Sequence, residues 1–138
     1  QLQKEKNDGL LILTTFLTFR GKAEKVKNNL LSFLIEQKTK GKSVVGYGAA
    51  AKGNTLLNYG GIKSDLLPYV CDAAPSKQGK YLPGSNIPIF LPDIISKEKP
   101  DYVLILPWNI SEEISKQLSF IRDWGGGFVT AVPELRIF

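Results

Sequence analysis

A glycine-rich segment near the middle of the chain has the residue types that an anion-binding turn needs. It reads GYGAAAKGNTLLNY and places Gly46, Gly48 and Ala51 in the G-x-G-x-x-A spacing of a dinucleotide-binding turn. Small residues let the backbone approach a pyrophosphate, and the start of the following helix favours negative charge. Lys52 adds a cation at that helix start, where the helix dipole makes a lysine mildly unfavourable, so the segment indicates anion binding. A purely structural strand-to-helix turn is the alternative.

Two further segments carry side chains that can contact a ligand. Trp108 and Asn109 follow the apolar run YVLIL, where a tryptophan either stacks on a base or sugar or covers the core. Lys77 and Tyr81 belong to a loop rich in glycine and proline, which is either a solvated turn or a phosphate-binding flap. Asp72 ends another apolar run, about where the ribose-binding acid of an NAD site belongs.

The composition removes several kinds of catalytic site. None of the 138 residues is histidine, and Cys71 is the only cysteine. A histidine base, a Ser-His-Asp triad, a Cys/His zinc site and a disulfide framework are therefore excluded within this chain. Cys71 lies in an apolar stretch and is expected to be a buried core residue. We expect no catalytic residue in the chain itself.

Charge and hydropathy bound the class of protein. A net charge of +5 favours anionic partners, and 43% hydrophobic residues are enough for one domain with a buried core. The charges are scattered without a nucleic-acid motif, and the apolar run at 10–19 is too short to span a bilayer. No signal peptide is evident, so we expect a cytoplasmic protein with neither nucleic-acid nor membrane partners. Because the chain starts at Gln1, we expect it to be part of a longer protein.

Hydrophobic spacing predicts the elements that must position these residues. An apolar stripe with 3-4-3-4-3 spacing predicts an amphipathic helix over 14–40, begun by Thr14 or Thr15 and ended at Gly41. The stripe consists of Phe16, Phe19, Ala23, Val26, Leu30 and Phe33.

From residue 43 onward, short apolar strands alternate with helices. Strands are predicted at 43–47, 67–72, 87–91, 102–106 and 128–132, and helices at 54–59, 92–99 and 110–124. The last helix is expected to start with a capping box of Asn109 and Glu112. This pattern predicts an α/β fold with a Rossmann-like, doubly wound, mainly parallel five-stranded sheet. Strands one and four are neighbours in such a sheet, so the turns at Gly48 and Trp108 should face one crevice.

Three blocks are more specific together than the glycine turn alone. They are GYGAAAKGNTLLNY at 46–59, KQGKYLPGSNIPI at 77–89, and KPDYVLILPWN followed by EEI at 99–114. In order and spacing they resemble the C-terminal domain of sugar-nucleotide C-methyltransferases, over about residues 5–133. Ala50 and Gly60 depart from the family pattern, which has proline and cysteine there.

The resemblance implies an enzyme of three parts. A small zinc-binding domain and a central S-adenosylmethionine-binding domain would precede a Rossmann-like C-terminal domain that helps to hold a nucleotide-linked keto-deoxysugar. The methyl group would go to a carbon next to the ketone, with a histidine-centred base in the central domain. Residues 1–41 would connect to that central domain, with a homodimer through 14–40 as a possibility, and residues 42–138 would form the C-terminal domain, inactive alone.

The resemblance also implies which residues bind the substrate. The glycine turn and Lys52 would line the pyrophosphate, whereas Trp108 and Asn109 would face the sugar or base. The full set of implied substrate-binding residues is Gly46, Gly48, Ala49, Lys52, Gly53, Asn54, Lys77, Tyr81, Trp108 and Asn109. Two alternatives remain open: an NAD(P)- or CoA-binding module, which Asp72 favours, and a non-catalytic scaffold or dimerisation domain that uses helix 14–40.

Overall fold

A six-stranded sheet organises the chain from residue 44 onward. The computed structural model describes the backbone of residues 2–138 and the side chains of residues 21–138. The strand order is β3-β2-β1-β4-β5-β6, and all neighbouring pairs are parallel except β5 and β6. The strands are β1 (Val44–Tyr47), β2 (Val70–Cys71), β3 (Ile89–Phe90), β4 (Tyr102–Ile105), β5 (Gly127–Thr130) and β6 (Arg136–Ile137).

The prediction of a mainly parallel α/β fold is confirmed, but the expectation of five strands is wrong. The sixth strand, β6, has only two residues and both are exposed, so no apolar pattern in the sequence predicts it. It forms because the chain reverses after β5, which lets Thr130 pair with Arg136 in an antiparallel register. The five predicted strands are all present, although β2 and β3 are shorter than the apolar runs that predicted them.

Side chains alternate between the two faces of the sheet and form two separate cores. Val44 in β1 and Leu104 in β4 join one core, whereas their neighbours Val45 and Val103 join the other. Because the strands are buried on both faces, they read as nearly continuous apolar runs.

Helices cover both faces. Leu30 and Leu57 bring the first two helices onto one core, and Ile95, Ile114 and Ile121 bring the later segments onto the other. The helices are α1 (Leu2–Thr39), α2 (Ala51–Tyr59), α3 (Asp93–Glu98) and α4 (Ser111–Gln117), with 3₁₀ segments η1 (Trp108–Ile110) and η2 (Ser119–Trp124).

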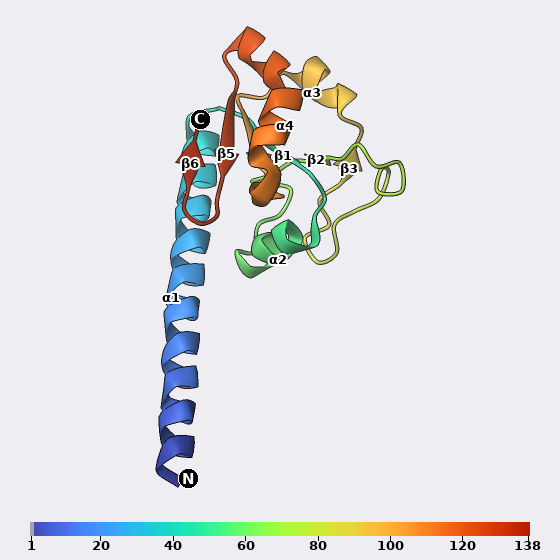
Figure 1. Cartoon of the computed structure of the whole chain (residues 1–138). Helices are drawn as coiled ribbons and strands as arrows, with labels where there is room; N and C mark the ends of the chain where they lie inside the picture. The colour runs from blue at the N-terminus through green and yellow to red at the C-terminus, as the bar shows by residue number, and fades with distance from the viewer. Residues whose placement is uncertain (1) are drawn as a thin grey trace.

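The long helix α1 starts earlier than its predicted cap. The helix runs without interruption from Leu2, so the expectation that Thr14 or Thr15 begins it is wrong. Leucine, glutamine, lysine and glutamate dominate the first turns, and no proline interrupts them. Figure 1 shows the N-terminal part of α1 extending away from the sheet. The predicted end is confirmed, because the helix stops at Thr39 and Gly41 adopts a φ of +74°.

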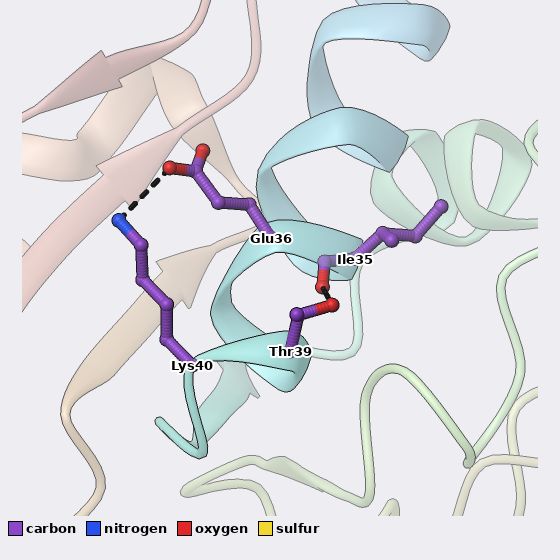
Figure 2. A network of polar contacts seen from close by, with 4 residues as sticks. All are labelled: Ile35, Glu36, Thr39 and Lys40. Atoms are coloured by element: carbon purple, nitrogen blue, oxygen red, sulfur yellow. Dashed lines mark hydrogen bonds and ion pairs between the residues drawn. The ribbon is translucent and has the colours of Figure 1, made fainter.

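The last turn of α1 is held by its own side chains. Thr39 donates from its hydroxyl to the Ile35 carbonyl over 2.9 Å, and the Lys40 ammonium pairs with the Glu36 carboxylate over 2.9 Å (Figure 2). This pairing raises the pKa of Lys40, through a hydrogen bond from the ammonium to Glu36. Both contacts are exposed to solvent, so they add little to the stability of the helix.

The predicted apolar face of α1 is buried where its side chains are described. Leu30 and Phe33 pack into the core, and the ring of Phe33 meets Tyr102 edge-on at 5.3 Å. Val26 is half-buried, and the side chains of Phe16 and Phe19 lie outside the described residues. The part of this face around Leu30 and Phe33 is therefore not available for a homodimer.

The start of α4 differs from the predicted capping box. Asn109 lies inside the 3₁₀ segment η1, and the residue that precedes α4 is Ile110, which supplies no side-chain cap. The tight turn after β4 takes up the residues that were expected to begin the helix. The predicted helix 110–124 is accordingly divided into α4 and η2.

Candidate functional site

Two turns meet at the carboxyl edge of the sheet. β1 and β4 are hydrogen-bonded neighbours, and the turns that follow them touch at Gly48 and Pro107. Gly48 has a φ of +90°, and a Cβ on it would lie 2.5 Å from Pro107 Cδ, so only glycine fits. The sequence-based expectation that these two strand ends adjoin is confirmed. The strand order also reverses here, which is where ligands bind in open parallel sheets.

The other two glycines of the turn allow close packing within the chain. A Cβ on Gly46 would lie 2.8 Å from Val70 Cγ2 on the neighbouring strand β2. A Cβ on Gly53 would lie 2.6 Å from Leu106 Cβ, so α2 rests directly on the end of β4. Gly53, rather than the exposed Ala51, gives the close helix–sheet contact that the third small residue of a dinucleotide turn provides.

Ala49, at the tip of the turn, has both of its backbone polar groups engaged. Its N–H donates to Asp72 Oδ2 over 2.8 Å, and its carbonyl accepts from Lys77 Nζ over 2.6 Å. The structure thus brings together two of the predicted site residues, Ala49 and Lys77. The Ala49 carbonyl and the Lys77 ammonium bond to each other rather than facing open space.

Asp72 fastens the loop after β2 to the same turn. Its Oδ2 accepts from Ala49 and its Oδ1 accepts from the N–H of Ala74 over 2.8 Å. Gln78 adds a bond from its amide to the Asp72 carbonyl over 2.9 Å. Each carboxylate oxygen therefore already has a donor inside the chain, which weakens the hypothesis that Asp72 holds the ribose of NAD.

The start of α2 offers backbone donors to a ligand. The first N–H groups of a helix have no partner within it, and Ala50, which precedes α2, provides no side-chain cap. Lys52 is exposed in this first turn, where no acidic residue balances it. Asn54, also in the first turn, has a buried Oδ1 without a hydrogen-bond partner among the described residues. The unpartnered N–H groups and the Lys52 ammonium make the α2 start an electropositive end at the carboxyl edge of the sheet, whereas Asn54 Oδ1 adds an acceptor there.

Trp108 forms a wall shared by two cavities at this edge. One is an apolar cavity of about 330 Å³, to which Leu56 of α2 contributes one helical turn after Lys52. It is lined by Lys22, Ala23, Val26, Leu56, Trp108, Val132 and Pro133. The other is a more polar cavity of about 220 Å³. It is lined by Trp108, Ser111, Thr130, Val132, Pro133, Glu134 and Arg136.

Sequence reasoning missed the residues that complete these cavities. Val26 and Lys22 belong to α1. Val26 was expected on the apolar face of this helix, but the place of both residues beside Trp108 depends on how α1 crosses the sheet. Thr130 could have been found from a signal in the sequence, because it ends β5 and the carboxyl ends of parallel strands line the same edge, whereas Arg136 belongs to β6, which no sequence pattern predicted.

Tyr81 is not brought to the turn. The loop runs back along β3, where the Gly79 N–H donates to the Ile89 carbonyl and Tyr81 bridges to Pro88. Each step from Lys77 towards Tyr81 therefore leads to the amino end of the sheet. Asn109, by contrast, is exposed beside Trp108 at the carboxyl edge.

Titration of the buried groups supplies no nucleophile at this edge. Burial raises the pKa of the Cys71 thiol to about 12, so the side chain is a neutral, inert core residue at neutral pH, as its apolar surroundings predicted. Burial also raises the pKa of Tyr47, with the Asp72 charge as the next cause. The described residues contain no group of three or more acidic, cysteine or histidine side chains that could hold a metal.

Comparison with known proteins identifies the family. The C-methyltransferase C-terminal domain family matches residues 1–133. The chain belongs to this family. It is 35% identical over 136 residues to the C-methyltransferase NovU of Streptomyces niveus, an alignment that covers 99% of this chain and 32% of that protein. This chain thus spans about a third of the length of that curated relative.

The comparisons confirm the resemblance found in the three sequence blocks. All three blocks lie within the matched residues 1–133. In the part of the chain that the structure describes, no helix combines the length and apolarity of a membrane span.

Proposed function

We propose that this C-methyltransferase C-terminal domain binds the nucleotide-linked keto-deoxysugar that a longer, S-adenosylmethionine-dependent C-methyltransferase methylates. The observation that carries the proposal is the start of α2 at the edge where the strand order reverses. Lys52 is exposed there, one helical turn before Leu56, which lines the apolar cavity together with Trp108. A nucleotide sugar has the matching chemistry, because it joins a doubly charged pyrophosphate to a flat base and a partly apolar sugar ring.

The parts of the site divide this ligand between them. The free N–H groups at the start of α2 and the Lys52 ammonium would hold the pyrophosphate. The indole of Trp108, which lines both the apolar cavity and the more polar one, would receive the base or the sugar. The strand order favours the Rossmann-like arrangement on which this assignment depends.

The residues of this chain do not fit S-adenosylmethionine or zinc. Ser43, Val44 and Val45 precede the glycine turn, where an S-adenosylmethionine site has an acidic residue, and both oxygens of Asp72 are engaged by the backbone. Zinc ligands are lacking because the sequence has no histidine and one cysteine. Both groups belong, in this proposal, to upstream domains of a cytoplasmic enzyme, to which residues 1–41 connect.

The proposal is tested with Lys52→Ala in the full-length methyltransferase. We expect the dissociation constant of the nucleotide sugar to rise by about 10- to 150-fold, because a hydrogen bond to a charged group contributes about 1.5–3 kcal/mol. The dissociation constant of S-adenosylmethionine should stay unchanged. Lys63→Ala, which alters an exposed lysine on the loop after α2, is the matched control.

Calorimetric titration of both ligands separates the alternatives. If Lys52→Ala leaves the affinity for the nucleotide sugar unchanged, Lys52 has no part in binding it. Saturable binding of NAD that Asp72→Ala abolishes would instead support a dinucleotide-binding module. A domain that binds neither ligand, in any variant, would be a scaffold.

A further inference from the structure

The hydrogen bonds around Ala49 join two parts of the chain that the sheet leaves separate. The β1–α2 turn and the loop after β2 each leave the carboxyl edge of their own strand. Asp72 and Lys77 connect them by holding the two sides of one residue, its N–H over 2.8 Å and its carbonyl over 2.6 Å. We call these two contacts on Ala49, made by Asp72 and Lys77, the turn clasp.

The clasp acts on the segment that leads into α2. Ala50 lies between Ala49 and the helix and has an extended conformation, with a φ of −84° and a ψ of 147°. The backbone changes from extended to helical after this residue, so the direction of the chain is set here. Because two bonds on Ala49 fix the turn from both sides, the direction in which α2 begins is fixed as well. Gly48 is already held by a bond from its N–H to the Cys71 carbonyl over 2.7 Å and by Pro107. Ala49 is therefore the residue of the turn whose position depends on the side chains of the loop after β2.

The loop that provides the clasp is itself secured. Ala74 donates to the second oxygen of Asp72, and Gln78 donates to the Asp72 carbonyl. Lys77 lies between these anchors, so its ammonium reaches Ala49 from an ordered loop although the residue as a whole is exposed. A hydrogen bond from a charged donor or to a charged acceptor is stronger than a neutral one, and the clasp contains one of each.

We propose that Asp72 and Lys77 are positioning residues for the nucleotide-sugar site and do not contact the ligand. They hold Ala49 so that the N–H groups at the start of α2 and the Lys52 ammonium face the pyrophosphate. The inference rests on the proposed function for its ligand, and on the two hydrogen bonds of Ala49 for its geometry. It replaces two roles that the sequence left open, a ribose-binding acid at Asp72 and a phosphate-binding flap at Lys77.

Hydrogen exchange tests the clasp without any ligand. In the clasped turn the Ala49 N–H is protected by Asp72, so the peptide spanning 46–54 should exchange faster in Asp72→Asn and in Lys77→Met. Asparagine at position 72 has one acceptor oxygen, whereas the N–H groups of Ala49 and Ala74 each bond to a separate oxygen of Asp72. Methionine at position 77 has no donor for the Ala49 carbonyl. Lys77→Arg keeps a cationic donor and should restore most of the protection, whereas Lys63→Met should leave exchange unchanged.

Ligand titration of the full-length methyltransferase then tests positioning. We expect Asp72→Asn and Lys77→Met each to raise the dissociation constant of the nucleotide sugar by about 2- to 12-fold, the scale of one net hydrogen bond, with no change for S-adenosylmethionine. Because both residues act on Ala49, the double variant should lose less than the product of the two single losses. Lys77→Arg should recover most of the affinity.

The outcomes distinguish the clasp from the proposed function. Multiplicative losses with unchanged hydrogen exchange would mean that Lys77 contacts the ligand directly, which would overturn the positioning role. Faster exchange with unchanged affinity would also overturn it, while Lys52→Ala still tests the proposed function separately. If the full-length protein with its original sequence does not bind the nucleotide sugar, the nucleotide-sugar function fails and the positioning role fails with it.

Discussion

Replacing Gly53 by alanine tests how closely α2 rests on the sheet. The new Cβ would lie 2.6 Å from Leu106 Cβ and 3.3 Å from both Leu106 Cγ and Cδ2. Ordinary contact between such atoms begins at 3.4 Å, so helix and strand must separate by about 0.8 Å. Leu106 Cβ is the first atom of a side chain that is 1% exposed, and no rotation of that side chain can move it away.

Two opposing effects set the size of the change. Alanine favours a helix over glycine by up to about 1 kcal/mol, and overpacking of a well-packed contact costs about 1–3 kcal/mol. We therefore expect Gly53→Ala to lower the free energy of unfolding by about 1–2 kcal/mol. The matched control is Gly21→Ala in α1, where a Cβ meets nothing within 4 Å, so only the helix-propensity gain applies.

Urea denaturation followed by circular dichroism measures both variants under the same conditions. Gly21→Ala should be as stable as the original chain or up to about 1 kcal/mol more stable, and Gly53→Ala should be less stable than both. The reasoning is refuted if Gly53→Ala is as stable as the original chain, because α2 would then not be held at the distance that the structure shows.

Two further predictions concern buried groups. Because burial raises the pKa of Cys71 to about 12 from its usual value of 9.0, the unfolded chain loses this proton first as pH rises. Through Cys71 alone, the free energy of unfolding should therefore fall by about 1 kcal/mol between pH 8 and pH 10. Urea titrations at several pH values should show a smaller decrease of this free energy for Cys71→Ala than for the original chain. Tyr69 has a buried hydroxyl without a partner among the described residues, so Tyr69→Phe should preserve or raise thermal stability by up to about 1 kcal/mol. A loss above 1 kcal/mol in Tyr69→Phe would show that the hydroxyl has a bonding role.

Local patterns determined much of the fold. The apolar runs at 43–47 and 102–106 predicted the two central strands, since strands covered on both faces leave no polar positions. The expectation that strands one and four are neighbours in such a sheet placed Gly48 and the Trp108 turn at one edge. The close approach of Gly48 to Pro107 confirms that the two turns adjoin. Three sequence blocks also indicated the C-methyltransferase family, which the comparisons confirm.

Other features depend on residues far apart in the chain. The roles of Asp72 and Lys77 could not be predicted, because the bonds to Ala49 join residues 23 and 28 positions apart and leave no periodic pattern. The cavities beside Trp108 likewise need Val26 from α1 and Val132 from the segment after β5.

The sequence by itself therefore determined the alternation of strands and helices, the lack of a histidine base or zinc site, and the family. These properties follow from residue type and local spacing, which the chain carries whether or not it is folded. Tertiary structure alone decided that α2 rests on Leu106, that Ala49 is held from both sides, and that Trp108 lines two cavities. Each of these depends on the distance between segments that only the packing of helices on a twisted sheet brings together.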